Sequence, residues 1–321
     1  MRNTRIVEML EVTEAAALSA GRWMGKGEKD SADLAAVEAM RKAFDLLDIS
    51  GEIVIGEGER DEAPMLYIGE KVGAGGEPID IAVDPLEGTN LTAYGQPNSL
   101  AVLAFAPKGT LLNAPDTYMR KIATGPTAAG VVHIDATPTE NIRAVAKALD
   151  RSVEDLVVCI LERERHEDLI REVRAAGARI RLISDGDVFG AVATAIEGTG
   201  IHLYMGTGGA PEGVLAATAM RCLGGAFMGR FEFRSPEERA RAEKMAKCDI
   251  DAVLTMDCLV NTDEAAFIAT GVTDGEMLRG VKYFGQGART HSVAMDNQTG
   301  TVRFIDTVYH TGSEKFWVRM E

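Results

Sequence analysis

The sequence predicts a layered α/β fold. From about residue 136 onward, expected strands and helices alternate along the chain, which is typical of sheets covered by helices. Residues 99–106 are almost wholly apolar and alternate little, as in a central strand buried on both faces. Residues 80–83 form another strand, apolar at Ile81, Ala82 and Val83, which leads directly into a turn that contains Pro85 and Gly88. Because carboxylates gather in this turn, the fold prediction also indicates where a site could lie.

The chain is expected to open with two helices. Residues 4–24 carry apolar side chains at helical spacing, and acidic residues fall between them. A charged, glycine-rich break follows at 25–30, and Ser31 is the predicted N-cap of a helix that continues to about Leu47. Two further elements are expected before residue 80, a strand at 52–55 and, after Pro64, a short helix at 65–72.

The later part of the chain is a series of helices and strands. Thr137 to Glu140 form a capping box with proline at the first helical position, which predicts a helix to Leu149. The other expected helices are 165–176, 188–196, one that ends near Cys222, and 236–247. The expected strands are 157–161, 179–183, 201–205, 266–268, 282–285, 290–295 and 301–309, with a hairpin turn at 296–300.

Composition limits the possible functions. The 321 residues are 46% hydrophobic and 26% charged, which is ordinary for a globular protein with a large core. Lys and Arg number 34 against 49 Asp and Glu, a formal charge of −15. Nucleic acid is therefore not expected as a main partner, because phosphate backbones bind basic surfaces. A small phosphorylated substrate remains compatible with this charge, since a few arginines and metal ions can reverse the local field.

Cysteine and histidine usage predicts oxygen ligands for any metal. The four cysteines show no C-x-x-C spacing, and there are only five histidines and no H-E-x-x-H motif. We therefore expect reduced cysteines without a zinc site or disulfide framework. The small apolar run 15–20 could pass for part of a signal peptide, but Glu8, Glu11 and Glu14 interrupt the region that would have to be hydrophobic, and no run approaches the length of a membrane helix. A cytoplasmic location is expected.

The strongest candidate site is the turn after residues 80–83. Asp84 and Glu87 stand together beyond the strand end with Thr89 close by, and Mg²⁺ or Mn²⁺ require oxygen ligands on a backbone that cannot drift. A solvated acidic turn is the alternative for this motif in isolation. Similar carboxylates follow other strands or begin helices, and together they favour multi-metal phosphoryl chemistry. The whole set of loop carboxylates is Asp33, Glu57, Asp61, Asp84, Glu87, Asp185, Asp187 and Glu212.

Three other features have a structural and a functional interpretation. Residues 206–213 follow a strand and precede a helix but lack G-x-G-x-x-G spacing, so dinucleotide binding is weakly supported and a phosphate cradle is the better hypothesis. Arg163 and Arg165 are either a solvated helix start or a fork for a phosphate group. Tyr118 and Arg120 are either surface residues or part of the same pocket. Asp33 could simply favour a helix dipole.

Several motifs resemble those of the bacterial class II, GlpX-type fructose-1,6-bisphosphatases. The motifs are Gly56 to Gly73, Asp80 to Thr89, Leu112 to Asp116, Asp185 to Val188 and Gly208 to Val214, in order over nearly the whole chain. The D-P-x-E-G-T turn also resembles the wider lithium-sensitive sugar-phosphatase and inositol-monophosphatase superfamily. The resemblance implies an α-β-α-β-α sandwich and a homo-oligomer, either a dimer or a tetramer.

The resemblance also implies roles for individual residues. The metal ligands, for two or more Mg²⁺ or Mn²⁺ ions, would be Asp33, Glu57, Asp84, Glu87 and Glu212. The catalytic residues would be Lys29, Asp61 and Thr89. The substrate-binding residues would be Glu87, Gly88, Thr89, Tyr118, Arg163, Arg165, Asp185, Gly186 and Asp187. Where the family often has basic-Pro-basic-His, this chain has Glu164 between its two arginines, which could weaken or redirect the phosphate contact.

We predict two halves and one activity from these observations. Residues 1–135 would be an N-terminal α+β half with most of the metal ligands, and residues 136–321 a C-terminal α/β half with the substrate-binding loops and Glu212. Without a linker between them, the halves are expected to pack tightly, to the point of forming one structural unit. The expected reaction is metal-dependent hydrolysis of fructose 1,6-bisphosphate to fructose 6-phosphate and phosphate, in gluconeogenesis. The alternatives are action on sedoheptulose 1,7-bisphosphate as well, an inositol monophosphatase, or a non-catalytic metabolite-binding assembly protein.

Overall fold

The computed structural model of the protein describes residues 3–58, 64–285 and 287–310. Its sheets are mixed and flanked by helices, so the predicted α/β fold class is confirmed. The chain forms two compact units: Met1–Leu111 together with Asp263–Glu321, and Leu112–Thr262. These units divide the chain differently from the predicted halves 1–135 and 136–321, because the last strands pair with strands of the N-terminal part.

The first unit is built on an eight-stranded sheet. Its order is β11-β12-β10-β4-β3-β1-β2, and β13 pairs with β12. β1 and β3 are parallel, whereas the other neighbours are antiparallel. The elements of this unit are α1 (Asn3–Gly21), α2 (Lys29–Phe44), β1 (Ile49–Ile55), β2 (Lys71–Val72), β3 (Glu77–Glu87), α3 (Thr89–Ala93), β4 (Leu100–Pro107), β10 (Ala266–Gly271), β11 (Lys282–Phe284), β12 (Gly287–Asp296) and β13 (Thr301–His310).

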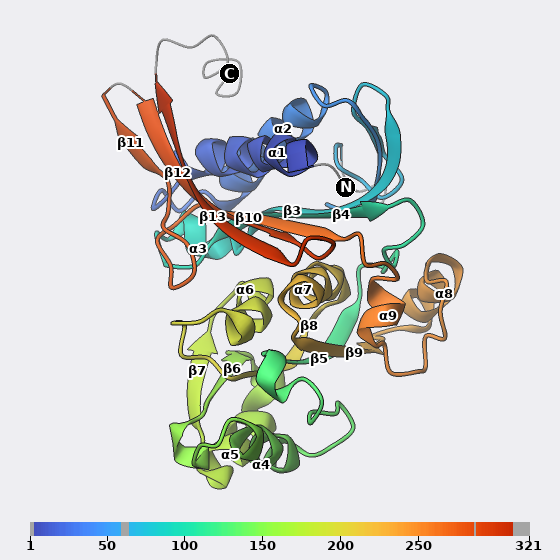
Figure 1. Ribbon diagram of the computed structural model, residues 1–321, viewed down its shortest axis with the longest axis vertical. Coiled ribbons are helices and arrows are strands. Elements are labelled where there is room, and N and C mark those ends of the chain that lie inside the picture. Colours follow the sequence, from blue (N-terminus) through green and yellow to red (C-terminus); the bar gives the residue numbers. More distant parts are fainter. Residues whose placement is uncertain (1–2, 59–63, 286, 311–321) are drawn as a thin grey trace. The chain divides into compact units, whose positions relative to one another are not determined.

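Helices α1 and α2 cover one face of this sheet (Figure 1). Leu18 of α1 and Met40 of α2 share one buried cluster with Ile81 of β3 and Leu103 of β4. The predicted central strand is confirmed, because β4 lies between β3 and β10 and every residue from Leu100 to Ala106 is buried. Among the described residues, no helix combines the length and apolar character needed to span a membrane.

Three local predictions for this unit were wrong. The helix expected at 65–72 is a turn followed by β2, because Leu66 has a positive φ of 54° and the Glu70 carboxylate accepts its N–H group. Helix α2 begins at Lys29, with Glu28 as its N-cap in place of Ser31. β3 continues through Pro85 to Glu87, although proline and glycine had been expected to end regular pairing.

The second unit is built on a five-stranded sheet of order β7-β6-β8-β5-β9. β6 is parallel to β7 and β8, and β5 is antiparallel to β8 and β9. The elements are β5 (Tyr118–Thr124), α4 (Pro138–Ala148), β6 (Val157–Leu161), α5 (Glu167–Ala176), β7 (Arg179–Ile183), α6 (Asp187–Val192), β8 (Leu203–Gly209), α7 (Ala210–Leu223), β9 (Ala226–Glu232), α8 (Pro236–Met245) and α9 (Met256–Leu259), with short 3-10 helices at Pro126–Ala128, Val153–Asp155, Glu164–His166 and Ala193–Ala195.

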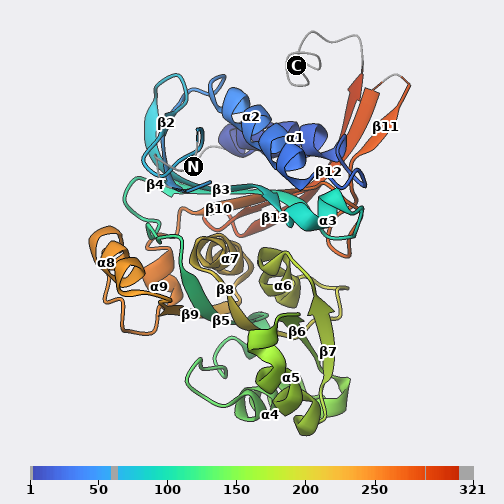
Figure 2. The same ribbon diagram turned by 180° about the vertical axis from the view of Figure 1, so that it is seen from behind.

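Helices cover both faces of the second sheet (Figure 2). Val158 and Ile160 of β6 belong to a cluster with Ile142 of α4 and Val173 of α5. The intervening Cys159 faces the opposite way, toward Gly190 of α6. Alternating side chains of one strand thus meet two helix layers. The first unit supplies a helix layer and a sheet, and the second supplies helix, sheet and helix, which are the layers that the sandwich prediction requires.

Most elements of the second unit match the predictions. The capping box is confirmed: Thr137 Oγ1 accepts the Glu140 N–H group at 3.2 Å, and the Glu140 carboxylate accepts the Thr137 N–H group at 2.8 Å. β6 and β7 have the predicted bounds. β8 begins later than expected and continues through the glycine-rich run to Gly209. Strands β5 and β9 and the short helix α9 were not predicted.

Candidate active site

The turn at the end of β3 is shaped by an irregular strand. β3 pairs with β4 as far as Asp84, shifts register, and pairs again at Glu87. The extra residues form a bulge, and Asp84 Oδ1 accepts the Leu86 N–H group at 3.0 Å. Gly88 follows as the N-cap of α3 with φ at 81°, where a Cβ atom would lie 2.7 Å from Leu91 Cδ1. This backbone fixes the direction of both carboxylates.

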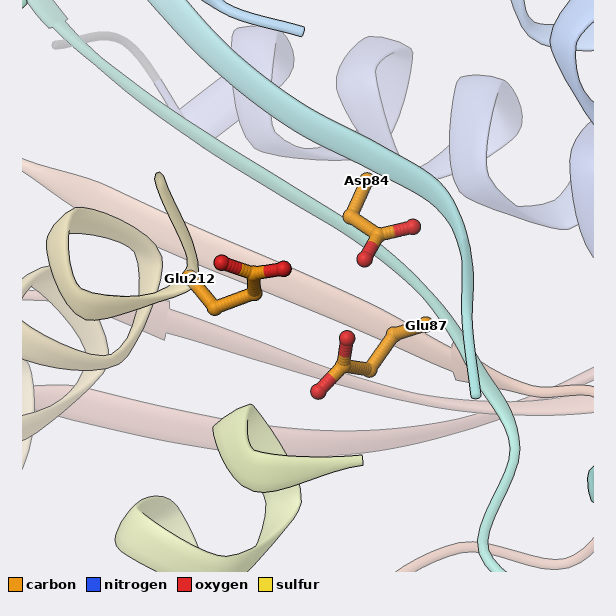
Figure 3. Close-up of side chains that lie close together, drawn as sticks. All are labelled: Asp84, Glu87 and Glu212. Carbon is orange, nitrogen blue, oxygen red and sulfur yellow. The ribbon is translucent and has the colours of Figure 1, made fainter. Parts of the chain in front are cut away.

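Asp84 and Glu87 could hold a metal ion. A carboxylate oxygen of Asp84 lies within 4.8 Å of one of Glu87, close enough for both to bind the same cation. Figure 3 shows these two side chains at the end of β3, and Glu212 at the start of α7. Because two carboxylates held this close repel each other, a cation is the natural partner for the pair.

Thr89, the first residue of α3, lies beside α2. Its hydroxyl is 3.3 Å from Asp33 Oδ1 and 3.1 Å from the Leu86 carbonyl oxygen, and it can donate to either. Partial burial raises the pKa of Asp33 above its usual range, although the hydrogen bond from Thr89 acts in the opposite direction. Lys29 is exposed at the first residue of α2, one turn before Asp33.

Glu57 lies beyond the end of β1. β1 and β3 are parallel and Ile55 pairs with Ala82, so Glu57 follows this pair by two residues, as Asp84 does on β3. The Glu57 N–H group donates to the Leu66 carbonyl oxygen at 3.1 Å, which holds the loop. Parallel strands thus bring the two predicted ligands to the same edge of the sheet. Asp61, predicted to be catalytic, lies outside the described residues.

Glu212 lies in the first turn of α7, after the N-cap Gly209 and Pro211. Its Oε2 atom is buried without a hydrogen-bond partner among the described residues. Burial raises the pKa of Glu212, the nearby Lys121 charge lowers it, and Asp187 raises it further. A buried carboxylate oxygen that lacks a donor is suited to a metal ion, so the donor set fits a hard divalent cation.

A buried polar cluster lies beside Glu212. Lys121 Nζ pairs with Asp187 Oδ2 at 2.7 Å, and the Tyr204 hydroxyl donates to the same oxygen at 3.0 Å. Gly186 is the N-cap of α6 with φ at 82°, and its N–H group donates to Asp185 Oδ1 at 3.1 Å. The Asp185–Gly186–Asp187 turn is thereby held at the start of α6. Lys121 was not recognised in the sequence, because β5 was missed.

The predicted phosphate-binding residues separate into two groups. Arg165 lies over the Tyr118 ring, with 4.8 Å from its Cζ to the ring centroid, and donates from Nε and Nη2 to the Thr207 carbonyl oxygen. Arg234, which the sequence analysis missed, lies over the same ring at 4.7 Å. Arg163 instead donates to the Glu162 carbonyl oxygen. The structure therefore gathers Tyr118, Arg165 and Arg234 in the second unit.

Arg163 lines a separate recess of about 580 Å³, formed with α5 and β7. The other charged residues that line it are Glu162, Glu164, Glu167, Arg171 and Arg174. The acidic and basic groups of this lining balance in number, so it has no marked preference for an anion. Glu164, the acidic residue between the two arginines, lines this recess together with Arg163. Arg120, the remaining candidate, lies on β5 with 42% of its side chain exposed, and its guanidinium is 3.3 Å from Asp135.

Comparison with known proteins identifies the family. The family model for bacterial fructose-1,6-bisphosphatase, glpX-encoded, matches residues 3–309. The chain belongs to the GlpX-type fructose-1,6-bisphosphatase family. A protein of Synechococcus sp. (strain JA-2-3B'a(2-13)) is 49% identical over 96% of each chain, and one of Acaryochloris marina (strain MBIC 11017) is 50% identical over 96% of each. One of Trichormus variabilis is 47% identical over 98% of this chain and 99% of its own.

The names of these relatives carry two activities. All three are named D-fructose 1,6-bisphosphatase class 2/sedoheptulose 1,7-bisphosphatase, the Acaryochloris protein with the number 2 added. The predicted resemblance to the GlpX-type family is therefore confirmed over nearly the whole chain. As a member of this family the protein is a metal-dependent phosphatase, and its acidic residues at the end of β3 could hold the metal.

Proposed function

We propose that this protein hydrolyses the 1-phosphate of fructose 1,6-bisphosphate, giving fructose 6-phosphate and phosphate, as a step of gluconeogenesis. The observation that carries the proposal is the family match over residues 3–309, joined to a fixed turn with Asp84, Glu87 and Thr89 in place. A non-catalytic assembly protein would have no need of this combination. An inositol monophosphatase would have no need of the arginine pair over Tyr118.

The proposed metal ligands are all carboxylates. Asp84 and Glu87 at the end of β3 form the centre of the set, and the ions would be Mg²⁺ or Mn²⁺, which prefer oxygen donors. When bound, two such ions neutralise phosphoryl oxygens and lower the pKa of a water molecule. The full set proposed is Asp33, Glu57, Asp84, Glu87 and Glu212.

Thr89 is proposed to orient the attacking water. Its hydroxyl lies between Asp33 Oδ1 and the Leu86 carbonyl oxygen, so its proton has two acceptors and its lone pairs remain available to a water molecule. Asp61 is proposed to support Thr89, and Lys29, exposed at the start of α2, to neutralise charge that develops on the phosphoryl group. Water held in line with the scissile bond loses less entropy on reaching the transition state.

The distal phosphate is proposed to bind at Tyr118, Arg165 and Arg234. Two guanidinium groups over one ring form a cationic surface, and guanidinium matches phosphate geometry through paired hydrogen bonds. Arg163, which lines the recess beside α5 and β7, is proposed to contact the same phosphate. The sugar is proposed to contact Glu87, Gly88 and Thr89 of one loop and Asp185, Gly186 and Asp187 of the other.

Sedoheptulose 1,7-bisphosphate is the second candidate substrate, because the relatives are named for both activities. Both substrates end in a phosphate that the arginines could bind, and they differ by one carbon. We further propose a cytoplasmic homo-oligomer, a dimer or a tetramer, as the resemblance implies.

Phosphate release from a panel of sugar and inositol phosphates tests the proposal. Each compound is incubated with Mn²⁺, with Mg²⁺ and with EDTA. Rapid release from fructose 1,6-bisphosphate that EDTA abolishes is the expected result. Release without metal, or no release from any bisphosphate, would refute the proposal, and preference for inositol monophosphate would assign the protein to the other branch of the superfamily.

A further inference from the structure

Lys121 is a lysine in an unusual position. Its side chain is 1% exposed, in the middle of β5. A buried ammonium group is costly unless it is paired and hydrogen-bonded. Lys121 meets this requirement through Asp187 Oδ2 at 2.7 Å, and the Tyr204 hydroxyl reaches the same oxygen at 3.0 Å. Three buried side chains of β5, α6 and β8 are thus joined through one carboxylate oxygen.

Two glycines make room for this cluster at the end of β8. A Cβ atom on Gly208 would overlap Asp187 Oδ2 and lie 3.2 Å from Lys121 Nζ. A Cβ atom on the next residue, Gly209, would overlap Glu212 Oε2. The Asp187 carboxylate therefore packs against Gly208 and the Glu212 carboxylate against Gly209, the next residue. Lys121 is a buried cation beside them. Since like charges repel, the two carboxylates need this cation to keep their positions.

We infer that Lys121 is a positioning residue for the active site, which holds Asp187 toward the sugar and supplies the positive charge beside which Glu212 is held for metal binding. The inference rests on the proposed roles of Asp187 and Glu212. In this inference Lys121 acts through the two carboxylates and not by contact with the substrate or the metal. Its role explains why β5 buries a lysine where an apolar residue would pack at lower cost.

Loss of Lys121 would release both carboxylates. Without the cation, Asp187 keeps the hydrogen bond from Tyr204, but its repulsion of Glu212 is no longer balanced. Side chains that orient ligands from behind typically change metal affinity or activity by about 10–100-fold when they are replaced. We therefore expect effects on both metal affinity and substrate affinity.

The test is Lys121→Met, which removes the charge and keeps most of the side-chain volume. Mn²⁺ binding is measured by calorimetry and the KM for fructose 1,6-bisphosphate by phosphate release, at a temperature where the variant is folded. Ile142→Ala serves as the matched control, because Ile142 is fully buried in α4 on the other face of the same sheet. We expect about tenfold weaker Mn²⁺ binding and about tenfold higher KM in Lys121→Met only.

A purely structural role predicts another result. If Lys121→Met loses thermal stability like Ile142→Ala and keeps normal Mn²⁺ affinity and KM, the inference is overturned. Should Lys121→Met fail to fold, Tyr204→Phe is used, for which a smaller rise in KM is expected and an unchanged KM overturns the inference. A wild-type protein that binds Mn²⁺ but hydrolyses no bisphosphate contradicts the proposed function, whereas the Mn²⁺ comparison still tests Lys121.

Discussion

The hydroxyl of Thr89 lies 3.3 Å from Oδ1 of Asp33, and this contact connects the start of α3 to the start of α2. Residues 56 positions apart in the sequence are thereby joined at the edge of the sheet where β3 ends. The contact depends on Gly88, whose positive φ lets the chain turn directly from β3 into α3.

Thr89→Ala tests the role of this hydroxyl. Turnover should fall on the order of 100-fold or more, because a group that positions or deprotonates water is lost. Mn²⁺ binding should change little, since the proposed metal ligands remain, and KM should change far less than turnover, since the variant loses one of several proposed sugar contacts. Thr89→Ser keeps the hydroxyl and should retain most of the activity. Near-normal turnover of the alanine variant would remove Thr89 from the mechanism.

Metal removal should abolish activity, and Glu87 should be needed for its return. EDTA followed by added Mn²⁺ or Mg²⁺ is expected to restore phosphate release in the wild type and to fail in Glu87→Gln, which loses a charged ligand. Glu77→Gln at the other end of β3 is the control, because Glu77 is an exposed partner of Arg5. Equal recovery in both variants would contradict the assignment of Glu87.

Arg234→Ala should weaken binding of the distal phosphate. Hydrogen bonds to charged groups contribute about 1.5–3 kcal/mol, so the KM for fructose 1,6-bisphosphate should rise at least about tenfold with little change in kcat. Arg239→Ala is a matched control, because Arg239 lies over the Phe233 ring at 5.6 Å and pairs with Asp251 at the surface. The assignment of Arg234 fails if the two variants have the same KM.

His166 should make stability depend on pH. Its Nε2 accepts the Thr207 N–H group at 2.8 Å, so Nδ1 carries the proton and donates to the Leu161 carbonyl oxygen at 2.7 Å. Burial lowers the pKa of His166 below its ordinary 6.5, the Arg165 and Arg163 charges lower it further, and the Leu161 carbonyl and Glu232 raise it. The neutral form is therefore the one that the fold favours.

A lowered pKa sets the direction of the effect. The contribution of His166 is fully present above pH 6.5 and is lost as the pH falls below that value toward the folded-state pKa. The Tm of the wild type should fall between about pH 7 and pH 5.5, and His166→Gln should show a smaller fall. Some dependence should remain, because burial also lowers the pKa of His202 and of His291. His133→Gln, at an exposed histidine, should behave like the wild type.

Sequence reasoning succeeded where the signal is local. The capping box at Thr137 and the apolar run that became β4 depend on neighbouring residues alone, and both were predicted. The turn at Asp84 to Thr89 was also recognised, although the strand continues through Pro85 because a bulge absorbs the proline. The turn that carries Asp84, Glu87 and Thr89 could thus be predicted from the sequence alone.

The failures have physical causes that lie far along the chain. β5 was missed because Arg120 and Lys121 look like surface residues. Lys121 can be buried because it pairs with Asp187, which lies 66 positions away in the sequence. Residues 65–72 do not form the predicted helix. They begin with a turn that is stabilised by Glu70, whose carboxylate accepts hydrogen bonds from the Leu66 N–H group and from Arg41. Arg234 joins Tyr118 across 116 positions, and no pattern near Tyr118 indicates it.

The return of residues 263–321 to the first unit has a consequence for folding during synthesis. β4 and β10 are adjacent antiparallel strands, yet the whole second unit is inserted between them in the chain. The second unit is continuous, so its contacts can form as soon as residue 262 has left the ribosome. The first sheet must wait for β10 to β13, with one edge of β4 unpaired meanwhile. The part of the protein that begins first is therefore completed last.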